Sequence, residues 1–171
     1  MKNLLYFFVI FISACSTNNQ LHSAIQFPPE QDVTLAHVLL ENSGHYVGQT
    51  VRWGGKIINV SNQQGELAVE VEQFPLNRYG FPLQKLGSNG RFIAQGITNI
   101  TAETLQPGLF ITFSAMIDSE TTKTIKRKDT VLPILKVQQS HLWPYRIANG
   151  KAYPSTGQEY QHHYMHMPSN Y

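Results

Sequence analysis

The sequence predicts a mainly β protein: a small barrel of five short strands, preceded by one short helix and followed by a disordered C-terminal tail. Between residues 50 and 137, apolar and polar side chains alternate with a period of two in several runs, as in half-buried strands. Polar turn residues separate these runs. From Tyr145 onward the chain is rich in Tyr, His, Gln and Asn and has no period, which indicates a disordered tail.

Composition bounds what such a fold can do. The chain has 171 residues, 42% of them hydrophobic, which is enough for one domain with a core of ordinary size. Its 13 Lys and Arg residues nearly balance its 11 Asp and Glu residues, so no nucleic-acid partner is expected. The single cysteine, Cys15, excludes an intrachain disulfide and a cysteine-based zinc site.

The chain begins with a segment typical of a secretion signal. Lys2 precedes an unbroken apolar run, Leu4 to Ile12, which is too short to span a bilayer as a helix. The run ends in the letters ISAC at residues 12–15, a pattern that resembles the bacterial lipobox. This resemblance implies that residues 1–14 form a lipoprotein signal peptide and that Cys15 carries lipid. The alternative is a secreted protein with a stray cysteine.

The lipid sets the expected location. Acyl chains contribute about 0.8 kcal/mol per buried methylene, so two or three of them hold a protein on a membrane almost permanently. Ser16 follows the cysteine where an aspartate would signal retention in the inner membrane. Similarity to sorted lipoproteins therefore implies the outer membrane, with the domain facing the periplasm. No cofactor is expected, and the covalent lipid on Cys15 is the only non-protein group that the sequence predicts.

The segment after the cysteine is expected to connect the membrane to the domain. Residues 15–31 are interpreted as the lipidated N-terminus and a tether, because Ser16 to Gln20 are small and polar. A short helix should follow, with Asp32 or Thr34 as its N-terminal cap and Gly44 close to its end. This helix carries Leu35, Val38, Leu39 and Leu40 and is expected to lie against the barrel.

The first two strands are predicted to form a hairpin. The Gly54-Gly55 pair should bend or bulge the first strand, and Asn62 to Gly65 should form the turn. In the second strand Val69 and Val71 alternate with glutamates. The stretch Phe74 to Lys85 contains two Phe-Pro-Leu triplets, whose prolines indicate a surface loop with apolar anchors. The shared face of the first strand consists of Val51, Trp53, Gly55 and Ile57.

The third and fourth strands follow this loop. Arg91 to Ile97 alternates again, and a Pro107-Gly108 turn leads into the clearest half-buried strand, Leu109 to Ile117. On this strand Phe113 is predicted to point into the core. Thr112 lies on the other face and should be much less important for stability.

The fifth strand completes the barrel. A polar and charged stretch, Ser119 to Thr130, precedes Val131 to Val137, whose Pro133 suits an edge or a bulge. Five short strands with polar hairpins favour an OB-like barrel over an open sheet. The barrel domain is expected to span residues 32–144, with residues 145–171 as the tail.

Two tryptophan motifs carry a resemblance to a known family. RWGG at residues 52–55 and HLWP at residues 141–144 each place a tryptophan in a fixed setting, together with GRFI and the PG turn before FITFSAMI. This set resembles the Slp family of outer-membrane lipoproteins, from the lipobox to about Pro144. The resemblance implies an association with the envelope or with stress and brings no established reaction. The His- and Tyr-rich tail lies outside the resemblance.

The two tryptophans are candidate ligand contacts. Trp53 and Trp143 could form an aromatic platform of the kind on which OB-folds stack bases or sugars. The competing interpretation is core packing, which the alternation with Val51 and Ile57 favours for Trp53. For Trp143, at the end of the last strand, both interpretations stay open.

A group of cations is a candidate surface contact. Lys123, Lys126, Arg127 and Lys128 lie close together in the sequence, with Asp129 as the single acid among them. They could contact lipid A phosphates or anionic head groups, to which each cation would contribute about 1 kcal/mol. A solvated hairpin loop is the simpler interpretation.

The tail holds a candidate metal site. His162, His163 and His166, with Met165 and Met167 nearby, could ligate copper or nickel, because imidazole and thioether groups suit these metals. Their loose spacing and the predicted disorder favour a tail without a metal.

The sequence contains no catalytic constellation, so no enzyme is expected. A Gly-x-Ser-x-Gly elbow and a His-Glu-x-x-His helix are both absent, and Ser140 and His141 face opposite sides of one strand. We expect a non-catalytic envelope factor that stabilises the envelope or binds a partner, such as an envelope protein or anionic lipid. The alternatives are a periplasmic module for a sugar, peptidoglycan fragment or anionic lipid, and a metal-binding protein that acts through its tail.

Overall fold

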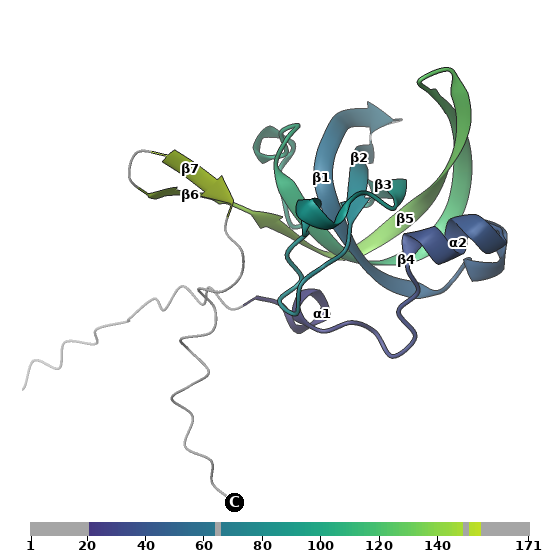
Figure 1. The fold of residues 1–171 in the computed structure, drawn as a ribbon, viewed down its shortest axis with the longest axis horizontal. Coiled ribbons are helices and arrows are strands. Elements are labelled where there is room, and N and C mark those ends of the chain that lie inside the picture. Colours follow the sequence, from purple (N-terminus) through teal and green to yellow (C-terminus); the bar gives the residue numbers. More distant parts are fainter. Residues whose placement is uncertain (1–20, 64–65, 149–150, 155–171) are drawn as a thin grey trace, which may run out of the picture.

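A computed structural model describes residues 21–63, 66–148 and 151–154, and its centre is a closed β-barrel (Figure 1). The barrel strands are β1 (Thr50–Gln63), β2 (Glu66–Phe74), β3 (Gly90–Gln95), β4 (Phe110–Ile125) and β5 (Lys128–Trp143). They close in the order β1-β2-β3-β5-β4, and all neighbours are antiparallel except β3 and β5. The predicted five-stranded OB-like barrel is confirmed.

Short helices flank the barrel. In the part of the chain that the structure describes, the α-helices α1 (Ser23–Gln26) and α2 (Leu35–Glu41) precede β1. The 3-10 helices described there are η1 (Ser43–Tyr46), η2 (Gln84–Leu86) and η3 (Ala102–Thr104).

The predicted short helix corresponds to α2. The hydroxyl of Thr34 accepts a hydrogen bond from the His37 backbone N–H at 3.3 Å, so Thr34 is the N-terminal cap. Leu35 and Val38 are fully buried in the barrel core, which confirms that the helix lies against the barrel. Leu40 is 84% exposed, because seven residues of helix bury only one narrow face.

The core has two parts. The larger part fills the barrel and includes Val51, Trp53 and Ile57 of β1, as the alternation predicted. The smaller part lies between the N-terminal segment, the loop after β2 and the start of β4, and this loop is anchored by buried Phe74 and Phe81 as expected. The buried members of the smaller part are Leu21, Ile25, Phe74, Phe81, Phe110 and Trp143.

Strand β1 approaches both of its neighbours very closely at its glycine pair. A Cβ atom on Gly55 would lie 1.9 Å from the Glu72 carbonyl oxygen, and one on Gly54 would lie 2.7 Å from the Ile111 carbonyl oxygen. The register shift between β1 and β2 falls later, between Ile57 and Asn59. The pair is therefore needed for close strand packing, and the predicted bulge lies beyond it.

Strands β4 and β5 form a hairpin that is longer than predicted and projects from the barrel (Figure 1). Their pairing continues to Ile125 and Lys128, so the stretch interpreted as a polar connection, Ser119 to Thr130, is almost entirely strand. Exposed strands can be polar on both faces, which hides them from a search for alternating apolar residues. Within the described residues β5 meets β3 from Ile134 onward, so Pro133 lies where the edge of β5 is still free, as expected.

The two ends of the folded domain differ from the predicted boundaries. Leu21 and Ile25 are buried, so the folded body begins within the segment 15–31 that was interpreted as a tether. At the other end, β6 (Tyr145–Ala148) and β7 (Lys151–Pro154) form an antiparallel hairpin. The prediction of disorder is wrong for these residues, because strands of only four residues are too short to show a clear period. The remainder of the tail lies outside the described residues.

Candidate functional site

The RWGG motif fastens the N-terminal segment to the barrel. The buried Arg52 guanidinium donates through Nη1 to the carbonyl oxygens of Ile25, at 3.2 Å, and Gln26, at 2.6 Å. The Arg52 backbone N–H donates to the Asp32 carboxylate at 3.0 Å. Burial lowers the pKa of Arg52 and raises that of Asp32, and the attraction between the two charges opposes both shifts. These bonds hold α1 and the chain before α2 against β1.

Both tryptophans are in the interior. Trp53 is 2% exposed, donates from Nε1 to the Val33 carbonyl oxygen at 2.7 Å, and packs against Phe92 with ring centroids 5.7 Å apart. Trp143 is 1% exposed and lies edge-on to Phe81, with centroids 5.4 Å apart. Both positions are those of core packing, and neither ring offers a surface on which a ligand could stack.

Thr112 joins the second tryptophan to the loop after β2. Its hydroxyl donates to the Gly80 carbonyl oxygen at 2.6 Å and accepts from Trp143 Nε1 at 2.9 Å. Thr112 is fully buried, although it lies on the face of β4 that the alternation assigned to solvent. The assignment of this face to solvent is therefore wrong, because the loop containing Gly80 covers it, and we now expect substitution of Thr112 to destabilise the domain.

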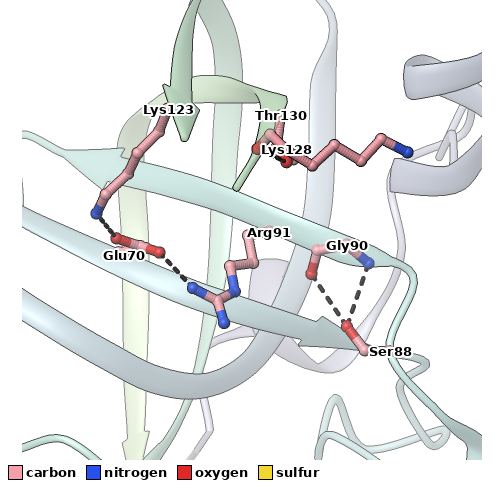
Figure 2. A network of polar contacts seen from close by, with 7 residues as sticks. All are labelled: Glu70, Ser88, Gly90, Arg91, Lys123, Lys128 and Thr130. Atoms are coloured by element: carbon pink, nitrogen blue, oxygen red, sulfur yellow. Dashed lines mark hydrogen bonds and ion pairs between the residues drawn. The ribbon is translucent and has the colours of Figure 1, made fainter. Parts of the chain in front are cut away.

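A buried carboxylate links the β4–β5 hairpin to the barrel (Figure 2). Glu70 of β2 is 6% exposed and forms ion pairs with Arg91 of β3, at 2.9 Å, and with Lys123 of β4. Burial alone would raise the pKa of Glu70, but the hydrogen bonds and charges of Lys123 and Arg91 outweigh it and lower the pKa. This network fixes the position of the hairpin relative to β2 and β3.

A pocket adjoins this network. It has a volume of about 190 Å³ and lies between β1, β2 and β3 on one side and the outer part of β4 on the other. Ala68 and Ile93 are its apolar walls, and no aromatic ring lines it. Its polar lining residues are Asn59, Ser61, Glu70, Thr121, Thr122 and Lys123. Such a lining can accept or donate hydrogen bonds but cannot stack a base or a sugar ring.

The predicted cation group lies at the tip of the β4–β5 hairpin. Lys126 and Arg127 form the turn with φ angles of 51° and 67°, and both are exposed, as is Lys128. Asp129 accepts a hydrogen bond from the Thr124 hydroxyl at 2.7 Å. Among the residues that the structure describes, Lys123 is the member of the group that forms an ion pair. The other three cations present their charges to solvent.

Ser140 and His141 do not form a catalytic pair. The Ser140 hydroxyl donates to the side-chain oxygen of Asn99, whereas His141 lies on the other face of β5 against Trp143, with ring centroids 4.3 Å apart. Burial lowers the pKa of His141 to about 4, so its imidazole is neutral at pH 7. The alternation of strand side chains explains this separation, as predicted.

The remaining candidates lie in parts of the chain that the structure does not describe. These are Cys15 and the tail histidines His162, His163 and His166. Within residues 21–63, 66–148 and 151–154, His, Cys, Asp and Glu side chains form no group of three that could hold a metal ion. The helices in these ranges are all too short or too polar to cross a membrane.

Two polar contacts that hold distant parts of the chain together were not predicted from the sequence. Arg52 and Glu70 are buried charges whose partners lie 26 and 53 residues away in the chain, at Gln26 and Lys123. A weak signal existed for Arg52, since it belongs to a motif with two glycines. The sequence contains no such signal for Glu70, because a strand residue that faces solvent would alternate with valines in the same way.

The fold and the N-terminal signals together define a class of protein, a small β-barrel domain placed close to a membrane anchor. The description "Outer membrane lipoprotein Slp family" matches residues 12–170, which is nearly the whole chain. The chain therefore belongs to this family of outer-membrane lipoproteins. The match includes the C-terminal segment, so the interpretation that the tail lies outside the resemblance is wrong.

Two relatives from Escherichia coli K12 agree with this assignment. The chain is 34% identical over 85 residues to outer membrane protein Slp, a stretch that covers 49% of this chain and 44% of that protein. It is 32% identical over 87 residues to the uncharacterized lipoprotein YeaY, covering 51% and 44%. The matches thus span less than half the length of each relative. No solved structure matches the chain significantly.

Proposed function

We propose that the protein is a non-catalytic envelope factor, which a lipid on Cys15 holds at the periplasmic face of the outer membrane, where it binds a partner or stabilises the envelope under stress. The attachment of the N-terminal segment to the barrel through Arg52 supports this proposal. Leu21 is already packed in the core and is six residues from Cys15, so an extended chain spans at most about 20 Å between them. A barrel held this close to a bilayer suits work at the membrane surface.

The rival functions have less support. A module for a sugar or peptidoglycan fragment would be favoured by exposed aromatic rings, whereas Trp53 and Trp143 are buried and the pocket has no aromatic lining. The names of the family and of its relatives refer to a membrane protein and a lipoprotein and to no reaction. Metal binding would depend on the histidines of the tail.

The anchor is tested with two single substitutions. Cys15→Ser removes the only thiol, so the variant should take up no labelled palmitate and should appear as a precursor or a soluble periplasmic protein. Ser16→Asp keeps the thiol and should take up label but fractionate with the inner membrane. Outer-membrane fractionation of the Cys15→Ser variant, together with an unlabelled wild type, would show that the lipid anchor is wrong.

A further inference from the structure

The tip of the β4–β5 hairpin combines concentrated charge with an unfavourable backbone. Lys126, Arg127 and Lys128 are exposed and, within the described part of the chain, form no ion pair. A two-residue hairpin turn with positive φ at both positions strongly prefers Asn-Gly, because the left-handed region is unfavourable for residues with long side chains. This chain places Lys126 and Arg127 there. Strained positions that persist are often functional, which gives a reason to ask what these side chains bind.

Contacts farther down the hairpin hold the backbone that carries these cations. Lys123 is tied to Glu70, which Arg91 also holds, and Thr124 is bonded to Asp129 across the two strands. Figure 2 shows Lys123 and Arg91 meeting Glu70 from two sides. Cations on a held backbone bind an anion with less loss of conformational freedom than the same side chains on a mobile loop.

The position of the tip argues against the anchoring membrane as its partner. In Figure 1 the hairpin projects from the barrel on the side away from α1, and the described chain begins at Leu21, just before α1. The attraction of an anionic membrane surface falls off within about one Debye length, roughly 8 Å at physiological salt. A barrel that stands on its α1 side therefore points the tip away from the lipid head groups.

The charged groups of the tip indicate the chemical class of its partner. The pocket farther down the hairpin lacks the aromatic rings that stack sugars or bases, and is lined by hydroxyl and amide groups and by the Glu70–Lys123 ion pair. Ammonium and guanidinium groups form their strongest hydrogen bonds with anionic oxygens such as carboxylates. We infer that the β4–β5 tip, formed by Lys126, Arg127 and Lys128, is a docking surface for an acidic polypeptide segment. This inference rests on the function proposed above, for which it names the class of partner. The direction in which the tip points depends on the proposed attachment to the membrane through Cys15.

The test uses a chain that begins at Ser16 and carries no lipid, so that its outcome is independent of the anchor. The probe is fluorescent poly-L-glutamate of about 20 residues, measured by anisotropy at 50 and 200 mM NaCl. Lys126→Asn combined with Arg127→Gly installs the preferred turn and removes two charges, so the melting temperature should stay or rise while affinity falls at least tenfold. Lys85→Gln combined with Lys136→Gln removes two exposed charges elsewhere and should reduce affinity less than threefold.

Three results would overturn the inference. Equal losses of affinity in the two double variants would mean that net charge alone drives binding. Affinity that does not fall between 50 and 200 mM NaCl would exclude an electrostatic docking surface. If vesicles of phosphatidylglycerol bind through Lys126 and Arg127 more tightly than poly-L-glutamate does, the tip is a lipid contact. Failure of the Cys15 experiment would leave these measurements unaffected.

Discussion

Thr112 offers the sharpest test of how the barrel is held to its covering loop. Thr112→Val keeps the shape of the side chain and removes the hydroxyl, which lies 2.6 Å from the Gly80 carbonyl oxygen and 2.9 Å from Trp143 Nε1. Each buried polar group that loses such a bond costs about 1–3 kcal/mol. The free energy of unfolding should therefore fall by about 2–6 kcal/mol, a large part of the stability of a small domain.

The matched control is Thr112→Ser, which keeps the hydroxyl and loses one methyl group. It should cost only about 1 kcal/mol. Both variants are measured by urea unfolding of the chain that begins at Ser16, followed by tryptophan fluorescence and circular dichroism. If Thr112→Val unfolds at the same urea concentration as Thr112→Ser, the hydroxyl does not carry the contact and the account of this face of β4 is wrong.

The remaining predictions concern the core, pH and the tail. Phe113 is fully buried, so Phe113→Ala should cost about 3–5 kcal/mol in the same assay, and a cost below 1 kcal/mol would contradict its position. The pKa of His141 in the folded protein is about 4, below the ordinary 6.5, so the unfolded chain binds more protons than the folded chain between these pH values. The free energy of unfolding should therefore decrease as the pH is lowered from about 6.5 to about 4, by up to about 3 kcal/mol. In His141→Gln this pH dependence should be smaller, and an unchanged slope would exclude His141 as its source. Deleting His162 to Tyr171 should leave the melting temperature unchanged if the tail buries nothing. Calorimetry at pH 7.5 should show copper or nickel binding no tighter than about micromolar, and submicromolar binding lost on truncation and at pH 5.5 would instead establish a tail metal site.

The sequence by itself determined the framework of this protein. Alternation located the barrel strands, Asp32 and Thr34 were the two candidate caps for α2, of which Thr34 is the cap, and the tryptophan motifs led to the family. These signals are local, because the direction of a side chain in a strand and the capping of a helix depend on a few neighbouring residues. Even so, alternation found only the inner part of β4, since the outer hairpin has no apolar face to reveal it.

Only the tertiary structure decided which polar residues are buried and what they hold. Alternation assigns one face of a strand to the core and leaves the other to solvent, yet the second faces of β1, β2 and β4 are covered by other parts of the chain. Arg52, Glu70 and Thr112 are therefore interior residues whose partners lie 20 to 53 positions away. Such contacts depend on how the chain is brought together in space, and their residues look the same in the sequence as polar residues that face water.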